Sequence, residues 1–282
     1  MHQRFLQIAQ FTNKLLLLGL LLCLANGCRV SKLVPEGKKL YTGAQIQVKT
    51  DKSTSVGDKN ALNYNLEETM YPLPNSNFLG LQPGIWSYYK MQKGDSGKVV
   101  QYLYKKYGEK PVYLSDVNPE KTLDIILNRC ENSGFFNANA KYEIKPHKNS
   151  ASIVYSINTT EPYQLSTYQY LRDSLPIDAY INKALINTLL ETNSRFDLEL
   201  FTAERERIDL ALKDEGYYNF NPEYFIFTTD TNQYDVRKFD LYLEVKQEIP
   251  QSAQIPYRIR KVYIYPNNMQ GTNGKPMDTL LF

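Results

Sequence analysis

The sequence contains few of the residues on which enzyme and metal chemistry usually depends. Its 282 residues include two histidines, three cysteines and one tryptophan. No spacing of cysteine and histidine matches a zinc site. A glycine-rich phosphate loop and a dinucleotide-binding fingerprint are also absent. We therefore expect a non-enzymatic protein that uses no cofactor and no metal.

Cysteines are too few for a disulfide framework. Cys23 and Cys28 lie near the N-terminus, and Cys130 stands alone in the middle of the sequence. If Cys28 is modified and the residues before it are removed, Cys130 has no partner within the chain. We expect Cys130 to be a small buried hydrophobic residue.

An excess of charge of one sign is also lacking. The formal net charge is +3, and two of the basic residues, Arg4 and Lys14, precede residue 28. The rest of the chain therefore carries 31 basic and 30 acidic residues. Nucleic-acid binding normally needs a clear basic excess, so we expect no nucleic-acid partner.

Two short polar motifs need to be weighed as functional sites. Residues 94–97 read Gly-Asp-Ser-Gly, as around the nucleophile of trypsin-like proteases, but His147 follows Ser96 instead of preceding it. A lipid-anchored hydrolase is therefore the weakest alternative. Asp230, Asn232 and Asp235 lack the spacing of a calcium loop and favour a polar turn.

The N-terminal segment predicts export and lipid attachment. About ten apolar residues, 15–24, are too short to span a bilayer, which needs ~20, and are typical of a signal peptide. Ala25, Asn26 and Gly27 then lead to Cys28, an order that resembles the lipobox of bacterial lipoproteins with its Leu-Ala pair one place early. We expect residues 1–27 to be a signal peptide and Cys28 to be acylated, for example by palmitate. The alternative is an ordinary signal peptide with an incidental cysteine.

Hydrophobic periodicity predicts both helices and strands, and the 23 tyrosines and 12 phenylalanines favour a sheet. In the first half we expect a strand at 41–49, a short helix near 62–70, a packed loop or broken helix at 71–91, a helix at 99–107, a helix from Pro119 capped by Asn118, and strands at 136–144 and 153–157. The helix at 99–107 is expected to pack on a sheet, and contact with a membrane surface is the alternative.

The same order recurs in the second half. We expect a strand at 163–171, a helix at 177–190, a helix at 198–215 capped by Asp197, and strands at 218–227 and 239–245. Alternating charges at Glu204, Arg205, Glu206 and Arg207 are typical of a solvated helix face or of ion pairs.

An internal repeat supports this division. Residues 134–139 and 216–221 both read Gly, aromatic, aromatic, Asn, any residue, Asn, with a period of 82 residues. Pro162-Tyr163 and Pro256-Tyr257 form a second matched pair. The sequence therefore predicts an α+β fold of tandem βααββ units, each with two helices on a three-stranded sheet and an open sheet edge.

The repeat and several motifs resemble polypeptide-transport-associated (POTRA) domains. Cys28 followed by Leu33-Val34-Pro35-Glu36-Gly37, then Pro74-Asn75, Leu79-Gly80-Leu81 and Trp86, is similar to the TamA-like outer-membrane assembly lipoproteins, TamL, of the BamA/TamA superfamily. The resemblance implies a linker at 28–40, POTRA-like domains at 41–158, with an insertion, and 159–250, and the first strand of a third unit at 251–282. The family's C-terminal barrel is not in this sequence.

The resemblance also implies partners and a location. The location is the periplasmic face of the outer membrane, where the lipid anchor holds the protein. The partners are unfolded outer-membrane proteins, a β-barrel encoded downstream or separately, and a TamB-like periplasmic protein. We expect precursors to bind by strand addition at 136–144 and 218–227, with candidate binding residues Phe136, Tyr142, Tyr218, Phe220 and Phe225. The alternative is an envelope adaptor that binds a partner protein or the cell wall without a transport role.

Overall fold

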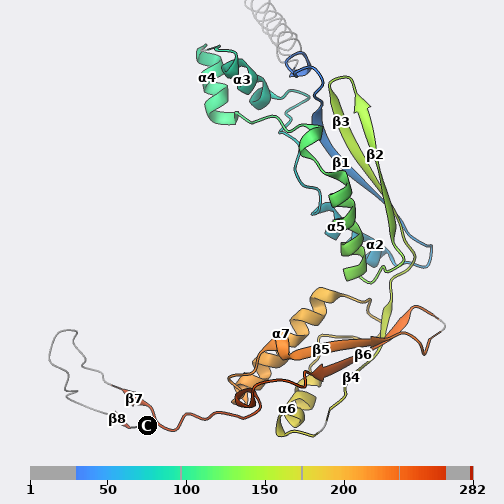
Figure 1. Cartoon of the computed structure of the whole chain (residues 1–282), viewed down its shortest axis with the longest axis vertical. Coiled ribbons are helices and arrows are strands. Elements are labelled where there is room, and N and C mark those ends of the chain that lie inside the picture. The colour runs from blue at the N-terminus through green and yellow to red at the C-terminus, as the bar shows by residue number, and fades with distance from the viewer. Residues whose placement is uncertain (1–29, 96, 173, 235, 265–279, 282) are drawn as a thin grey trace, which may run out of the picture. The chain divides into compact units, whose positions relative to one another are not determined.

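The chain folds into two compact units, described here from a computed structural model (Figure 1). The structure describes residues 30–95, 97–172, 174–234, 236–264 and 280–281. One unit contains the residues up to Glu131 together with Phe135–Glu161, and the other contains Asn132–Gly134 and the chain from Pro162 onward. The second unit has the order strand, helix, helix, strand, strand, and the first has the same order with two further helices inserted between its two sheet-covering helices. The predicted α+β fold of tandem βααββ units is therefore confirmed.

The first unit is a mixed three-stranded sheet with two helices against it. Its sheet has the order β1-β3-β2, with β1 parallel and β2 antiparallel to the central strand. The core joins Tyr155 and Ile157 of β3 to Leu66 of α2 and Ile126 of α5. The elements are β1 (Leu40–Lys49), α2 (Val56–Glu67), α3 (Pro83–Gln92), α4 (Lys98–Tyr107), α5 (Pro119–Asn132), β2 (Asn139–His147) and β3 (Ser150–Asn158).

The second unit repeats this arrangement without the two inserted helices. Its sheet order is β4-β6-β5, again with one parallel and one antiparallel pair. Ile181 of α6, Ile208 and Leu212 of α7 and Leu243 of β6 form its main core. The elements are β4 (Gln164–Tyr170), α6 (Pro176–Leu185), α7 (Leu198–Asp214), β5 (Phe225–Asp230) and β6 (Lys238–Val245), followed by two short paired strands, β7 (Tyr263–Ile264) and β8 (Leu280–Leu281).

Local signals in the sequence fix where the main helices begin. Asn118 Oδ1 accepts a hydrogen bond from the Lys121 amide at 3.0 Å, and Asp197 Oδ1 accepts one from the Glu199 amide at 3.1 Å. Both side chains occupy donors that a helix leaves unpaired in its first turn. The predicted caps of α5 and α7 are therefore confirmed.

Three expectations about elements need correction. The segment 71–91, expected to be a packed loop or a broken helix, contains the regular helix α3 from Pro83, where a proline suits the first helical turn. The strands expected from Phe136 and Tyr218 begin later, at Asn139 and Phe225. Phe136 and Tyr218 lie in turns, because Gly134 and Gly216 end the preceding helices with φ of +86° and +98°.

The charged segment of α7 also differs from a simple solvated face. Glu204 is fully buried and forms an ion pair with Arg207. The predicted ion pairing is therefore present, but the alternative of a solvent-exposed side chain is wrong for Glu204. Within the described ranges, no helix has the length and apolar character needed to cross a membrane.

Candidate functional site: the open sheet edges

Each sheet has two edges, and loops cover part of one of them. The Tyr41 amide at the start of β1 donates to Val112 O at 2.9 Å. In the second unit, the Leu165 amide of β4 donates to Ser194 O at 2.8 Å. Loop backbone therefore pairs with the first residues of β1 and β4, in the same place in both units. The opposite edges, formed by β2 and β5, are the candidate site.

Hydrogen bonds at the ends of β3 show which of its residues face β2. The Leu40 amide donates to Asn149 O at 2.9 Å, and the Thr159 amide donates to Lys49 O at 3.0 Å. Asn149 and Thr159 thus direct their backbone groups toward β1, and so do the odd-numbered residues between them, because these groups alternate along a strand. The even-numbered residues of β3 therefore pair with β2.

The pairing register then identifies the outward groups of β2. Glu143 lies opposite Val154, so its amide and carbonyl face the ladder. Tyr142 and Ile144, one position away on either side, direct their amides and carbonyls outward. The amide and carbonyl of Ala140 also point outward, because it lies two positions before Tyr142. In the described part of the chain, no loop backbone pairs with this edge.

Pro146 is placed as this alternation requires. Proline has no amide hydrogen, so within a strand it is tolerated where that hydrogen would point away from the sheet. The backbone groups of Pro146 face the same side as those of Tyr142 and Ile144, away from the sheet. Pro146 lies opposite Ala151. It therefore leaves the ladder intact and ends the row of outward donors near the hairpin turn.

The β5 edge can be assigned in the same way. The Lys246 amide donates to Tyr224 O at 2.9 Å, so this pair faces the ladder between β5 and β6. The backbone groups of Ile226 and Thr228 then face β6, while Phe227 and Thr229 direct their amides outward. β5 is shorter than β2, six residues against nine, so it offers a smaller edge.

The five predicted binding residues fall into different environments. Phe136 and Tyr218 are exposed, at 46% and 74%, but lie in turns before the strands. Phe220 and Phe225 are buried, with ring centroids 4.9 Å apart, so their side chains belong to the core of the second unit. Tyr142 lies on β2 and packs partly against the core of the first unit.

Sequence reasoning included Ile144 in the expected edge strand 136–144 but did not name it as a candidate binding residue. Ile144 is 39% exposed and has an outward backbone. Its alternation with Glu143 and Lys145, followed by Pro146, is the signal that could have identified it. The predicted lipidation site, Cys28, lies outside the described residues.

The polar motifs singled out in the sequence lie partly within the described residues. Asp230 Oδ1 accepts a hydrogen bond from the Asn232 amide at 2.8 Å, as expected for a polar turn. Asp235 and Ser96 lie outside the described residues. Among the residues that are described, no three His, Cys, Asp or Glu side chains are grouped to hold a metal ion.

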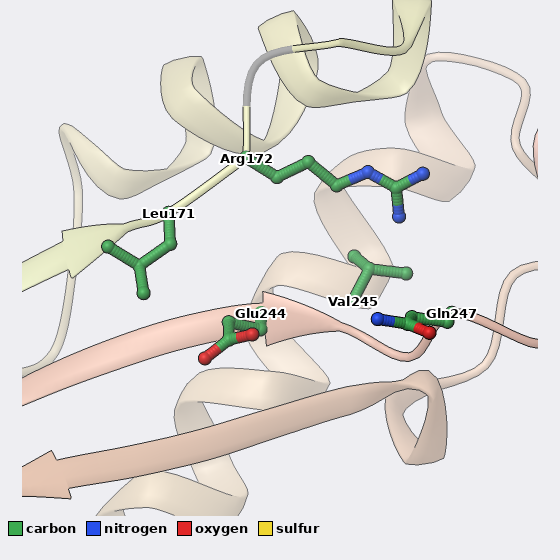
Figure 2. Close-up of a pocket in the computed structure, with 5 residues that line it drawn as sticks. All are labelled: Leu171, Arg172, Glu244, Val245 and Gln247. Carbon is green, nitrogen blue, oxygen red and sulfur yellow. The ribbon is translucent and has the colours of Figure 1, made fainter.

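A hollow of about 370 Å³ lies at the ends of β4 and β6 (Figure 2). Figure 2 shows the Arg172 guanidinium and the Glu244 carboxylate pointing in opposite directions. Arg172 instead approaches Asp178, with its Nε 3.8 Å from Asp178 Oδ2. The hollow therefore lacks a paired acid and base, and it is lined by Leu171, Arg172, Glu244, Val245 and Gln247.

Comparison with known proteins gives similar structures only at low identity. No family model matches the sequence, and no curated protein matches it. The POTRA3-5 structure of BamA from Haemophilus influenzae is 18% identical and covers 76% of this chain and 69% of its own, with a TM-score of 0.38. POTRA1-2 of Omp85 from Anabaena is 11% identical and covers 77% of this chain and 100% of its own, with a TM-score of 0.35. The POTRA-like fold of this chain rests on its own βααββ order and sheet registers.

Proposed function

We propose that this protein is the periplasmic, lipid-anchored part of an outer-membrane protein assembly factor. Its POTRA-like units capture unfolded barrel precursors by adding a precursor strand to β2, and secondarily to β5. The observation that carries the proposal is the row of outward backbone groups at Ala140, Tyr142 and Ile144. Such groups bind an extended chain through its backbone and therefore accept many sequences.

The side chains along β2 suit a guest of mixed polarity. Tyr142 and Ile144 present apolar surface on one face, while Lys141, Glu143 and Lys145 are exposed on the other. Strands of outer-membrane barrels alternate apolar and polar residues with the same period of two. A precursor strand paired with β2 can therefore place its apolar residues beside Tyr142 and Ile144.

The remaining features of the proposal derive from the sequence resemblance. They are an acylated Cys28, a linker at 28–40, POTRA-like domains at 41–158 and 159–250, and the beginning of a third unit at 251–282. A β-barrel encoded downstream or separately would receive the captured precursor, and a TamB-like protein is a further candidate partner. The role is non-enzymatic, because capture and release of a strand require no covalent bond to be made or broken.

A proline substitution tests strand addition directly. Ile144→Pro removes an outward donor and leaves the β2–β3 ladder intact, whereas Ile144→Ala removes the same side chain and keeps the donor. We expect Ile144→Pro to weaken binding of a fluorescent peptide with the alternating pattern of a barrel strand by about fivefold, the effect of one net hydrogen bond. Ile144→Ala should have a smaller effect.

Thr229→Pro and Thr229→Ala form the corresponding pair on β5. Fluorescence anisotropy gives the affinities, and circular dichroism establishes that each variant is folded. Unchanged peptide binding in both proline variants would contradict the proposal. A loss at Ile144 alone would limit capture to β2.

The lipid anchor is tested separately from capture. Cells grown with radiolabelled palmitate should label the wild-type protein, and Cys28→Ser should remove the label and release the protein from the membrane fraction. Ser31→Ala is a control for a nearby small-residue change and should keep the label. An unlabelled wild-type protein would show that the anchor is absent.

A further inference from the structure

The first unit contains a helical hairpin, α3 and α4, inserted between the two helices that cover the sheet. Figure 1 shows this hairpin beside the start of β1, away from α2 and α5. Ile85 and Tyr89 of α3 pack against Val30 and Leu40, and all four residues are buried. Val30 follows Cys28 by two residues, a reach of about 7 Å for an extended chain. The hairpin thus holds the segment next to the proposed lipid anchor.

The hairpin is closely packed at its open end. A Cβ atom added to Gly84 of α3 would lie 2.3 Å from Tyr107 O at the end of α4. Glu109 Oε2 accepts hydrogen bonds from Asn75 Nδ2 at 3.1 Å and from the Ser76 amide at 2.9 Å. Because α4 packs against α3 and α3 packs against Val30, the surface of α4 has a fixed position relative to Val30.

One face of α4 is covered by no other part of the described chain. Val100 is buried at 5% exposure, whereas Val99 and Tyr102 are 68% and 60% exposed. Lys105 and Lys106 continue this face one turn later, and both are exposed. Lys106 Nζ lies 5.9 Å from the centre of the Tyr102 ring. The face therefore combines apolar surface, a tyrosine and two cations.

The hairpin also carries an excess of basic residues. Between residues 90 and 110 there are six lysines and only two acidic residues, an excess of four positive charges. The whole chain has an excess of three. A protein partner could match either apolar surface or charge, but lysines with tyrosine and valine next to an acylation site suit the interface of an anionic bilayer.

We propose that the exposed face of α4, formed by Val99, Tyr102, Lys105 and Lys106, binds the surface of a bilayer that contains anionic phospholipid. The proposal rests on the proposed anchor at Cys28 for its place in the cell. The acyl chains hold the protein at the membrane, and the α4 face fixes how the first unit is oriented on it. Tyr102 and Val99 enter the headgroup region while the lysine ammonium groups bind lipid phosphates.

Vesicle binding tests this surface without the lipid anchor. The chain from residue 28 with Cys28→Ser is mixed with vesicles of phosphatidylcholine alone, or of phosphatidylcholine with phosphatidylglycerol, and bound protein is measured by sedimentation. We expect binding only to the vesicles with phosphatidylglycerol, and weaker binding as salt rises. Lys105→Gln combined with Lys106→Gln should lower the partition coefficient roughly thirtyfold, since each lysine near an anionic surface contributes about a factor of five.

A matched pair on another face of the first unit controls for net charge. Lys52 and Lys59 are exposed, and Lys59 lies in α2, which Figure 1 shows away from the hairpin. Lys52→Gln with Lys59→Gln therefore makes the same change in charge. This control should reduce binding by less than threefold. Tyr102→Ala, which keeps every charge, should also weaken binding.

Three results would overturn the proposal. They are no binding to either vesicle, equal binding to both, or equal losses in the Lys105–Lys106 variant and the control pair. Palmitate labelling of Cys28 reports on the anchor independently. If the protein binds vesicles but is not labelled, the proposal for the α4 surface stands and the proposed anchor is wrong. If it is labelled but does not bind vesicles, the anchor stands and the proposal for the α4 surface is wrong.

Discussion

Glu204 and Arg207 form a two-point ion pair in the second unit. Arg207 Nε lies 2.8 Å from Glu204 Oε2, and Arg207 Nη2 lies 2.8 Å from Glu204 Oε1. The same carboxylate accepts hydrogen bonds from Thr188 Oγ1 at 2.7 Å and from the Leu189 amide at 3.0 Å. Glu204 therefore ties α7 to the loop after α6. That loop continues to Ser194, which covers the start of β4.

Removing Arg207 should destabilise the second unit strongly. Arg207→Ala leaves the fully buried Glu204 carboxylate without its cation, and breaking a buried pair in this way costs about 3–5 kcal/mol. Urea unfolding followed by circular dichroism measures the change. Glu206→Ala, an exposed position on the same helix, should change the free energy of unfolding by less than about 0.5 kcal/mol. Equal effects of the two substitutions would contradict this role of the pair.

The pair also predicts a dependence of stability on pH. Burial alone would raise the pKa of Glu204, but hydrogen bonds from Arg207, Leu189 and Thr188, with the Arg207 charge, lower this pKa below its ordinary value of 4.5. Because the folded-state pKa is depressed, the stabilisation is complete above the unfolded-state value and is lost as pH falls through the folded-state value. Unfolding free energies measured from pH 7 downward should fall more steeply below pH 4.5 in the wild type than in Glu204→Gln. Parallel profiles would show that another group is responsible.

Two glycines of the first unit should respond to alanine in opposite directions. Gly84→Ala places a Cβ atom 2.3 Å from Tyr107 O and should push α4 away from α3, at a cost of about 1–3 kcal/mol. Gly57→Ala lies in α2, where the nearest atom to the new Cβ is 3.7 Å away, and should stabilise by about 0.5–1 kcal/mol. Trp86 in α3 is the single tryptophan of the chain, so its fluorescence reports on the hairpin. An unchanged Trp86 emission in Gly84→Ala would mean that the hairpin tolerates the added atom.

Cys130 should be unreactive in the folded protein. It is fully buried, and burial together with the charge of Glu131 raises the pKa of its thiol to about 12. Nearly all of the thiol is therefore protonated at pH 8, and reagents that attack the thiolate should not label it. Mass spectrometry after maleimide treatment of the Cys28→Ser chain from residue 28 measures this. Labelling should appear only when urea unfolds the first unit, and rapid labelling without urea would contradict the burial of this side chain.

Much of the fold follows from local features of the sequence. Asn118 and Asp197 mark helix starts because their side chains bind amides within two or three residues. The alternation from Phe239 to Val245 identifies a strand with one apolar face, and its residues Phe239, Leu241, Leu243 and Val245 are buried. Such signals depend on neighbours in the sequence, so they can be recognised without the fold.

Strand starts and the α3 helix could not be placed in this way. Phe136 and Tyr218 have strand-forming side chains, but the turns after Gly134 and Gly216 hold them outside the sheets. Pro83 begins a helix in a segment whose prolines and glycines predict irregular structure. For α3, packing of Ile85 and Tyr89 against Val30 and Leu40, about 50 residues earlier in the chain, overrides the local preference.

Local sequence patterns are enough to predict the tandem βααββ units, the helix caps and the buried faces of the central strands, because each depends on short-range periodicity or capping. The open edges depend on long-range contacts, since the loops that cover β1 and β4 are far from those strands along the chain. Tertiary structure likewise buried Glu204 beside Arg207 and set α3 against Val30. Burial and edge pairing depend on which distant segments meet, and no local pattern records that.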